Sequence, residues 1–504
     1  MTLVKRNIIA NFAAQGWASL MGLAFVPLYI KFLGIEAYGL IGFYIMLNTV
    51  FQLLDFGLSQ TMNREMARYS AMPDKAGEAR DLVWTLQAGY WCIGLLIGAG
   101  VLVLAPFIAG HWIKPGSVPV STVQRAVTIM GLLAAVQWPL SFYDGGLMGL
   151  QKQVLSSSIR VGIATLASVG SVLILWKVST TITAYFLWQM TVSALHVLLL
   201  TGFLWRSLPS APRGPVFNPG LVRNIWKFAA GMSGIAVSAT VLMQLDKVIL
   251  SKLLTLDLFG YYTLAGTVSN AVPNLMVGPI FNALFPRFTA LSATNDTAAL
   301  KTLYHQASQL MAVVVLPVAT VLVFFSRDVI LLWTGNARTA GMSGPIVSVL
   351  VVGMALNALM VLPYTLQISH GWTSIGLRIN TFFIITLVPA IYFLTVRYGP
   401  VGAASVWVIL NSVYIAIGVP LTHRRLLPNE MGPWFREDIL PPAFVVIATV
   451  GLARWIITSP LSPVTAVATL AGVLASSALA AALVAPEMRT WLFGQLAKLK
   501  SIKT

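Results

Sequence analysis

The sequence predicts an all-α protein that crosses a membrane about fourteen times, and three observations predict it. Of the 504 residues, 57% are hydrophobic and only 9% are charged, whereas about 25% of a soluble domain is charged. The mean hydropathy is +0.82. The apolar residues gather in runs of about 20 residues, which is the length an α-helix needs to cross a bilayer. This composition excludes both a water-soluble globule and a disordered chain.

Apolar runs of membrane-spanning length follow one another along the whole chain. The first six lie at 8–30, 39–60, 83–108, 123–147, 154–176 and 182–205. Six more lie at 228–250, 259–285, 304–326, 345–369, 374–396 and 401–422, and the last two at 439–458 and 464–484. We therefore expect four parts, namely an N-terminal six-helix lobe at 1–205, a cytoplasmic linker at 206–224, a C-terminal six-helix lobe at 225–425, and two additional helices with a basic cytoplasmic tail at 426–504.

Basic residues predict the orientation, because cytoplasmic loops of membrane proteins carry an excess of lysine and arginine. If the N-terminus is cytoplasmic, 22 of the 32 lysines and arginines fall on the inner side. We therefore expect both termini in the cytoplasm. The same bias accounts for the net charge of +17, and nucleic-acid binding is not expected because no long polar, basic segment is present. The single cysteine, Cys92, allows neither an intrachain disulfide nor a cysteine metal cluster.

The two six-helix halves resemble each other in sequence. The segment Leu-Gly-Ile-Glu-Ala-Tyr-Gly at 33–39 recurs as Leu-Asp-Leu-Phe-Gly-Tyr at 256–261, and other motifs recur at offsets near 220 residues. Because each half holds an even number of helices, both halves enter the membrane from the same side, which predicts parallel repeats. Transporters built this way bind substrate between the halves and alternate access by rocking. The last two helices fall outside the repeat.

Several segments, in their order and spacing, resemble the oligosaccharide-flippase family of polysaccharide biosynthesis and export proteins. They are 7–39 with Phe-Leu-Gly-Ile-Glu-Ala-Tyr-Gly, 55–58 with Asp-Phe-Gly-Leu, 146–151 with Gly-Leu-Met-Gly-Leu-Gln, 245–262, and 398–404. The resemblance covers about residues 4–425. It implies the multidrug/oligosaccharidyl-lipid/polysaccharide exporter superfamily, whose members form two six-helix lobes in a V.

The resemblance also implies a function. It implies a flippase that translocates an undecaprenyl-pyrophosphate-linked oligosaccharide, such as an O-antigen, capsule or exopolysaccharide unit, across the bacterial inner membrane by alternating access. The implied partners are this lipid-linked oligosaccharide and membrane lipids, with a polysaccharide polymerase as a further candidate.

Arginines are the candidate ligands for the pyrophosphate, because a guanidinium binds phosphate bidentately and stays charged. The candidates form three repeat-related pairs, which are Arg160 with Arg378, Arg64 with Arg287, and Arg6 with Arg223. The alternative is that these residues only set the topology and extend to lipid headgroups. Arg160 and Arg378 lie deeper in their apolar runs than the loop arginines, which favours a binding role.

Charged and aromatic residues inside the runs give the remaining candidates. The candidates for ion coupling or gating are Asp55, Asp144, Asp246 and Lys247, because charges in hydrocarbon are costly and rarely without a role. Interhelical ion pairing is the alternative for them. Trp17 is a candidate for stacking on sugar rings in the cavity.

Two other functions compete with a flippase. A cation-coupled multidrug antiporter of the same fold would need membrane-embedded carboxylates, but arginines outnumber acidic residues within the lobes, which favours an anionic substrate. A membrane enzyme acting on the same lipid is disfavoured by the short outer loops and the scattered 15 acidic residues. We therefore expect no catalytic residue, no metal and no cofactor.

Overall fold

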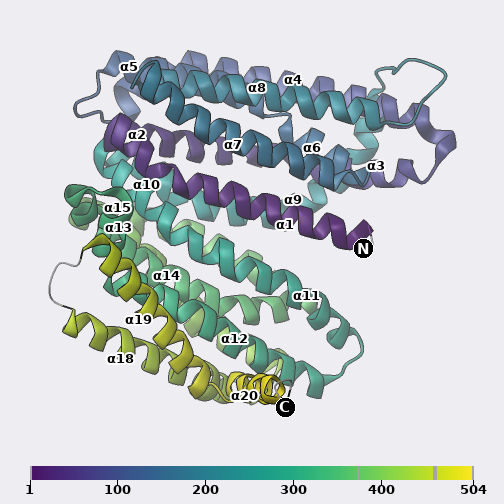
Figure 1. Ribbon diagram of the computed structural model, residues 1–504. Coiled ribbons are helices and arrows are strands. Elements are labelled where there is room, and N and C mark those ends of the chain that lie inside the picture. The colour runs from purple at the N-terminus through teal and green to yellow at the C-terminus, as the bar shows by residue number, and fades with distance from the viewer. Residues whose placement is uncertain (1–2, 373, 458–461, 502–504) are drawn as a thin grey trace. The chain divides into compact units, whose positions relative to one another are not determined.

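The computed structural model describes residues 3–372, 374–457 and 462–501, and at several helical positions, of which 222–236 form the longest run, it describes the backbone alone. The described chain is almost entirely α-helical (Figure 1). It divides into two compact units, Met1–Gly260 and Tyr261–Thr504.

The first unit is a bundle of long helices joined by short segments. Its helices are α1 (Leu3–Ala24), α2 (Val26–Gln52), η1 (Leu53–Asp55), α3 (Leu58–Ser70), η2 (Pro73–Lys75), α4 (Ala76–Phe107), η3 (Ile108–Trp112), α5 (Val120–Gln137), α6 (Leu140–Gly149), α7 (Gln153–Lys177), α8 (Ile182–Ser207), α9 (Pro219–Leu253) and the start of α10 (Leu256–Val272). Within it, α5 packs against α4 and α8, α1 against α7, and α2 against α9.

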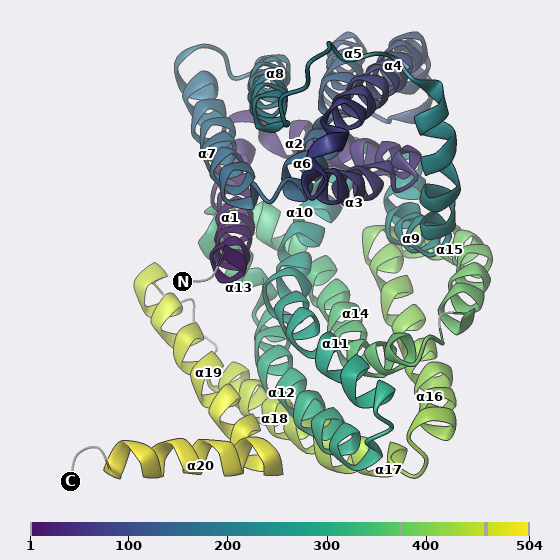
Figure 2. The same ribbon diagram turned by 90° about the vertical axis from the view of Figure 1, so that its right-hand side faces the viewer.

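The second unit continues from α10 to the C-terminal helix. Its helices are η4 (Pro273–Val277), α11 (Gly278–Ala293), α12 (Thr297–Phe324), α13 (Ser326–Thr334), α14 (Ala337–Ser369), α15 (Ser374–Val413), η5 (Tyr414–Gly418), α16 (Val419–Leu426), α17 (Met431–Pro433), η6 (Trp434–Ile439), α18 (Leu440–Ile456), α19 (Pro463–Val484) and α20 (Pro486–Ser501). Helix α12 packs against α14, α18 and α19, and α20 lies across the end of α19 (Figures 1 and 2).

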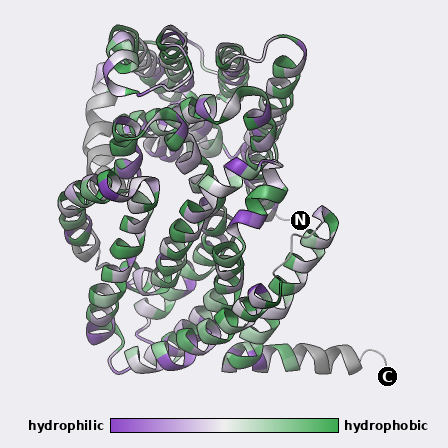
Figure 3. Cartoon of the chain, turned by 90° about the vertical axis from the view of Figure 1, so that its left-hand side faces the viewer, coloured by the Kyte–Doolittle hydropathy of each residue, from purple (hydrophilic) through white to green (hydrophobic). Residues whose placement is uncertain are grey.

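The surface of the helices is apolar, as lipid exposure requires. Ten helical stretches of the described chain are long and apolar enough to cross a membrane. Large apolar side chains are exposed on these helices, for example Val103 at 79% and Val464 at 80%. Apolar residues, drawn in green, cover most of the helical length (Figure 3). The protein is therefore a polytopic, multi-pass all-α membrane protein. The number of fourteen spans is not confirmed, since the runs predicted at 374–396 and 401–422 merge into one stretch, Arg378–Leu426.

Glycine and proline account for the differences between the predicted runs and the helices. Gly34 and Gly399 adopt left-handed backbone, with φ of 81° and 62°, so consecutive helices meet there without a loop. Pro139 separates α5 from α6 within the run predicted at 123–147, because proline cannot donate the backbone hydrogen bond that a continuous helix needs.

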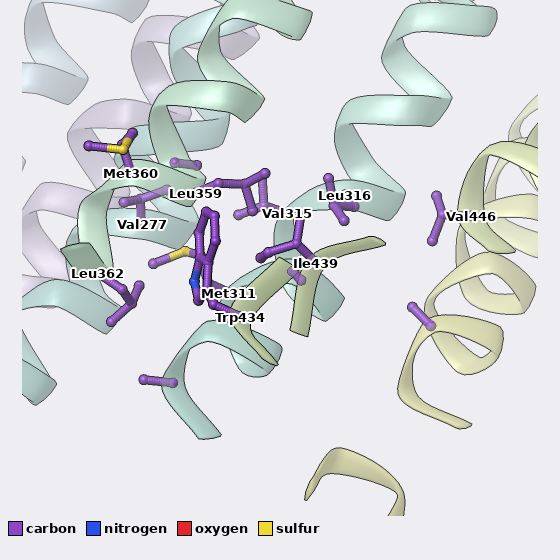
Figure 4. Close-up of a cluster of buried hydrophobic side chains, with 14 of the residues drawn as sticks. Val277, Met311, Val315, Leu316, Leu359, Met360, Leu362, Trp434, Ile439 and Val446 are labelled. Atoms are coloured by element: carbon purple, nitrogen blue, oxygen red, sulfur yellow. The ribbon is translucent and has the colours of Figure 1, made fainter. Parts of the chain in front are cut away.

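Trp434 belongs to a large buried cluster of the second unit. Its side chain is 1% exposed and lies among Met311, Val315 and Leu359 (Figure 4). The indole N–H donates to the hydroxyl of Ser308 at 3.2 Å, so the polar end of the ring is satisfied inside the core. This side chain fastens the segment before α18 to α12.

Candidate substrate-binding site

An ion pair between α6 and α7 is the central polar feature of the first unit. The guanidinium of Arg160 donates to the carboxylate of Asp144 at 2.8 Å, and the two side chains are 29% and 24% exposed. The hydroxyl of Ser156 donates to the same carboxylate. His196 on α8 lies close enough to interact electrostatically with both charges. The structure thus joins two residues that the sequence predicted separately, Asp144 as a gating candidate and Arg160 as a phosphate ligand.

This ion pair leaves the guanidinium able to bind an anion. A guanidinium carries five N–H donors, and the described pair engages one of them. Because Asp144 offsets the charge of Arg160, the arginine can remain within the bundle without the full cost of an isolated charge in hydrocarbon. A phosphate that approaches the partly exposed side chain can therefore add to, or displace, the internal carboxylate.

A row of polar side chains joins α1 to α7. Asn7 donates to Gln153 at 2.6 Å, and Ser157 donates to Asn11 at 2.9 Å. Both pairs are separated by 146 residues, so the two helices run in the same direction. In apolar surroundings such hydrogen bonds fix the register of two helices.

Trp17 continues this row along α1. Its indole N–H donates to the hydroxyl of Thr165 at 2.8 Å. The side chain is 39% exposed, which leaves part of its ring open. The hydrogen bond holds the side chain of Trp17 against α7. Stacking of its ring on a sugar stays a prediction.

Gln137 connects three helices through a network that the sequence reasoning missed. Its amide oxygen accepts from Tyr44 at 2.6 Å and from Asn48 at 3.1 Å, and its amide nitrogen donates to Ser193 at 2.8 Å. The signal that could have revealed it is the position of an uncharged polar residue inside an apolar run, where each polar group must find a partner.

The other two acidic candidates also have partners. Asp55 accepts from Tyr90 and from the hydroxyl of Ser59, the latter at 2.8 Å. Asp246 is 4% exposed and lies 3.8 Å from the ammonium of Lys247. Asp55 is therefore linked to α4, Asp246 lies beside a cation of its own helix, and a role in ion coupling or gating stays a prediction for both.

The remaining arginine candidates lie on helix surfaces. Arg64 is half exposed and lies 4.0 Å from Glu65, while Arg6, Arg287 and Arg378 are exposed on α1, α11 and α15. The side chain of Arg223 lies outside the described residues. Arg160 and Arg378 belong to different units, so their pairing stays a prediction.

A second charged cluster, also missed from the sequence, links α12 to the segment that precedes α18. His305 lies 2.6 Å from Asp438 and 3.2 Å from Glu430, and Lys301 lies 2.7 Å from Glu430. Gln309 donates to Asp438 at 2.9 Å. The hydrogen bond from Lys301 holds the pKa of Glu430 below its ordinary value of 4.5. Within the described residues, no group of three or more histidine, cysteine or acidic side chains could hold a metal ion.

A bundle of lipid-exposed helices with polar groups inside it defines a polytopic membrane fold. Two solved structures share this fold. The structure titled "Lipid II flippase MurJ, inward closed conformation" matches with a TM-score of 0.70 and 11% identity over 95% of this chain and 98% of that chain. An inward-facing multidrug resistance MATE family transporter of the MOP superfamily matches with a TM-score of 0.67 and 16% identity over 81% and 94%. This chain therefore shares the fold of these two solved structures.

The chain belongs to the polysaccharide biosynthesis protein family, whose sequence model matches residues 4–292. A curated protein of Shigella flexneri named "Putative O-antigen transporter" is 23% identical over 426 residues, which cover 82% of this chain and 97% of that protein. The family resemblance predicted from the sequence is thus confirmed. The protein is a membrane transporter of this family and not an enzyme.

Proposed function

We propose that the protein is a flippase that translocates an undecaprenyl-pyrophosphate-linked oligosaccharide across the bacterial inner membrane by alternating access. The observation that carries the proposal is Arg160, a partly exposed arginine held inside a helix bundle by Asp144. Arginine is the side chain best suited to a pyrophosphate. The family and the O-antigen relative support a glycan substrate.

The proposed organisation is the one the repeat predicts. Residues 1–205 and 225–425 form two six-helix lobes with 206–224 as their cytoplasmic linker, and 426–504 add two helices and a basic tail. Both termini lie in the cytoplasm, in accord with the distribution of lysine and arginine. Because the repeat makes Arg160 and Arg378 equivalent, we expect both of them to contact the substrate's pyrophosphate. Binding to both lobes then favours their closure.

The ion pair also bears on the competing antiporter function. A cation-coupled antiporter needs a carboxylate that is free to exchange protons and cations, but Asp144 is neutralised by Arg160 at 2.8 Å and Asp246 lies beside Lys247. This pairing favours an anionic substrate. A polysaccharide polymerase that consumes the delivered units is the proposed partner.

Complementation of a strain that lacks this gene tests the proposal. The wild-type chain is expected to restore surface polysaccharide. Replacing Arg160 and Arg378 together by glutamine should abolish it and leave lipid-linked units inside the cell, and lysine should restore it partly, as a charge without the bidentate geometry. Arg397→Gln, on the exposed surface of α15, is the matched control. Full surface polysaccharide in the double glutamine variant would overturn the assignment of these arginines, and failure of the wild-type chain to complement would overturn the proposed function.

A further inference from the structure

Three segments of the first unit meet at one end of the bundle. They are the turn at 33–39, the segment at 113–118 that precedes α5, and the junction of α9 with α10 at 254–260. The backbones of Lys114 and Thr255 form a parallel β-bridge. The backbone N–H of Leu256 donates to the carbonyl of Lys114 at 2.9 Å, which holds the second and third of these segments together.

Glu36 joins the first segment to the second. Its carboxylate accepts from the backbone N–H groups of Gly116 at 2.6 Å, Ser117 at 2.9 Å and Val118 at 3.2 Å. The hydroxyl of Ser117 donates to the same carboxylate. Hydrogen bonds to a charged acceptor are stronger than those between neutral groups. Glu36 therefore holds the segment at 113–118 against the turn at 33–39.

The first and third segments touch through two glycines, and the contact is reciprocal. A Cβ added to Gly39 would meet the carbonyl oxygen of Leu256, and a Cβ added to Gly260 would meet the carbonyl oxygen of Ile35. Gly260 follows Gly39 by 221 residues, and Leu256 follows Ile35 by the same 221. The two contacts are therefore one contact repeated by the internal symmetry of the chain.

This reciprocity shows that the equivalent turns of the two sequence repeats contact each other within the first unit. When equivalent surface patches touch each other in both directions, the contact lies on a twofold relation. Here both sides of the contact are glycine against backbone carbonyl, so no flexible side chain can move aside for a larger residue. The backbones reach this closeness only because both positions lack a Cβ.

We propose that Gly39 and Gly260 form a reciprocal closure at the outer end of the transport route, with the bridge between Lys114 and Thr255 as its latch, while Glu36 holds the segment that carries Lys114 against the turn at 33–39. The inference rests on the proposed function for the direction of transport and the orientation of this end. Opening of the route parts the two glycine contacts and the latch together, and closure reforms them. The glycines are positioning residues, because they set the approach of the two repeats and need not touch substrate.

Disulfide trapping tests the closure without any substrate. Lys114 and Thr255 are exposed, and residues paired across neighbouring strands lie about 4.8 Å apart, within the range of about 4.4–6.8 Å between the Cα atoms of a disulfide. The parent is Lys114→Cys with Thr255→Cys in a Cys92→Ser background. In membranes treated with a mild oxidant, we expect the cross-link to form efficiently, as measured by mass spectrometry of the digested protein.

Adding Gly39→Ala to this parent should lower the cross-linking rate at least fivefold, because the backbones can no longer close. Gly266→Ala is the matched control, since it lies on the same helix as Gly260 and its Cβ would have nothing within 4 Å. It should cross-link like the parent. If Gly39→Ala does not reach the membrane, Gly260→Ala is measured in its place and should lower the cross-linking rate in the same way. Equal cross-linking rates in the glycine variants and the control would overturn the closure.

The cross-linked protein also distinguishes this inference from the proposed function. In cells that lack the wild-type gene, the oxidised double-cysteine variant should deliver no surface polysaccharide, and a reductant should restore delivery. Continued delivery by fully cross-linked protein would overturn the closure while leaving the flippase function intact. The opposite outcome is a chain whose cross-linking depends on Gly39 but which never restores surface polysaccharide. That result would support the closure and overturn the flippase function.

Discussion

Removing either partner of the ion pair between Arg160 and Asp144 tests the candidate site most directly. The pair joins α7 to α6 through one hydrogen bond of 2.8 Å, and its side chains are 29% and 24% exposed. Exposed pairs contribute about 0.2–1 kcal/mol, whereas removing one partner of a buried pair costs about 3–5 kcal/mol. For this intermediate exposure we expect Arg160→Gln to cost about 1–3 kcal/mol of stability.

A double-mutant cycle measures the pair itself. Arg160→Gln leaves the charge of Asp144 with the hydroxyl of Ser156 as its described partner, and Asp144→Asn leaves the guanidinium without its counter-ion. The double variant removes both charges, so its loss of stability should fall short of the sum of the single losses by about 1–2 kcal/mol. Thermal unfolding of the purified protein in detergent provides the comparison. Additive losses would refute the coupling inferred from the geometry.

Binding measurements with the same variants separate a role in substrate binding from a role in packing. A hydrogen bond to a charged group contributes about 1.5–3 kcal/mol, which corresponds to about 10- to 150-fold in Kd. We expect Arg160→Gln to weaken the binding of a short polyprenyl pyrophosphate by this factor. Asp144→Asn should not weaken it, because that change removes the internal anion that competes for the guanidinium. Equal effects of Arg160→Gln and the control Arg397→Gln would refute the binding role.

Three further predictions concern the helical scaffold of the two units. Trp434→Ala should lower the free energy of unfolding by about 3–5 kcal/mol, because it empties the centre of a packed cluster, and thermal unfolding measures this loss. The pKa of Glu430 is lower in the folded protein than its ordinary value of 4.5. Its ionised form therefore adds stability above that pH, and this stability is lost as the pH falls through the pKa of the folded state. The melting temperature should therefore decline in acid, and less steeply in Lys301→Gln. Asp81 accepts from the backbone N–H of Val216, in the segment between α8 and α9, so Asp81→Asn should speed protease cleavage within that segment.

The apolar runs predicted most of the fold, because about 20 apolar residues in sequence have few stable arrangements other than a membrane helix. The apolar runs predicted the helix boundaries wrongly where the backbone makes a turn or a kink. Gly34 and Gly399 join helices without a loop, so hydropathy alone merges or misplaces their boundaries. Local sequence marks such glycines as candidates for a turn, but whether a turn or a kink results depends on the packing of both helices.

The candidate site could be predicted only in part, for a physical reason. Arg160 and Asp144 were each identifiable as costly charges in apolar runs, but they are 16 residues apart on different helices, so their pairing depends on how α6 and α7 pack. Glu36 accepts from backbone groups about 80 residues away, and no side-chain pattern marks a backbone donor. Gln137 could have been singled out, since a buried amide must satisfy several hydrogen bonds.

The charged cluster between α12 and the segment before α18 has a consequence for biosynthesis. His305 contacts Asp438 across 133 residues of chain. At a synthesis rate of about 5–20 residues per second, roughly 7–27 s pass between the synthesis of His305 on α12 and that of its partner Asp438. During that interval Lys301 and His305 have none of their acidic neighbours. A chain that stops before residue 430 therefore carries Lys301 and His305 without Glu430 and Asp438, the acidic partners that they contact in the folded protein.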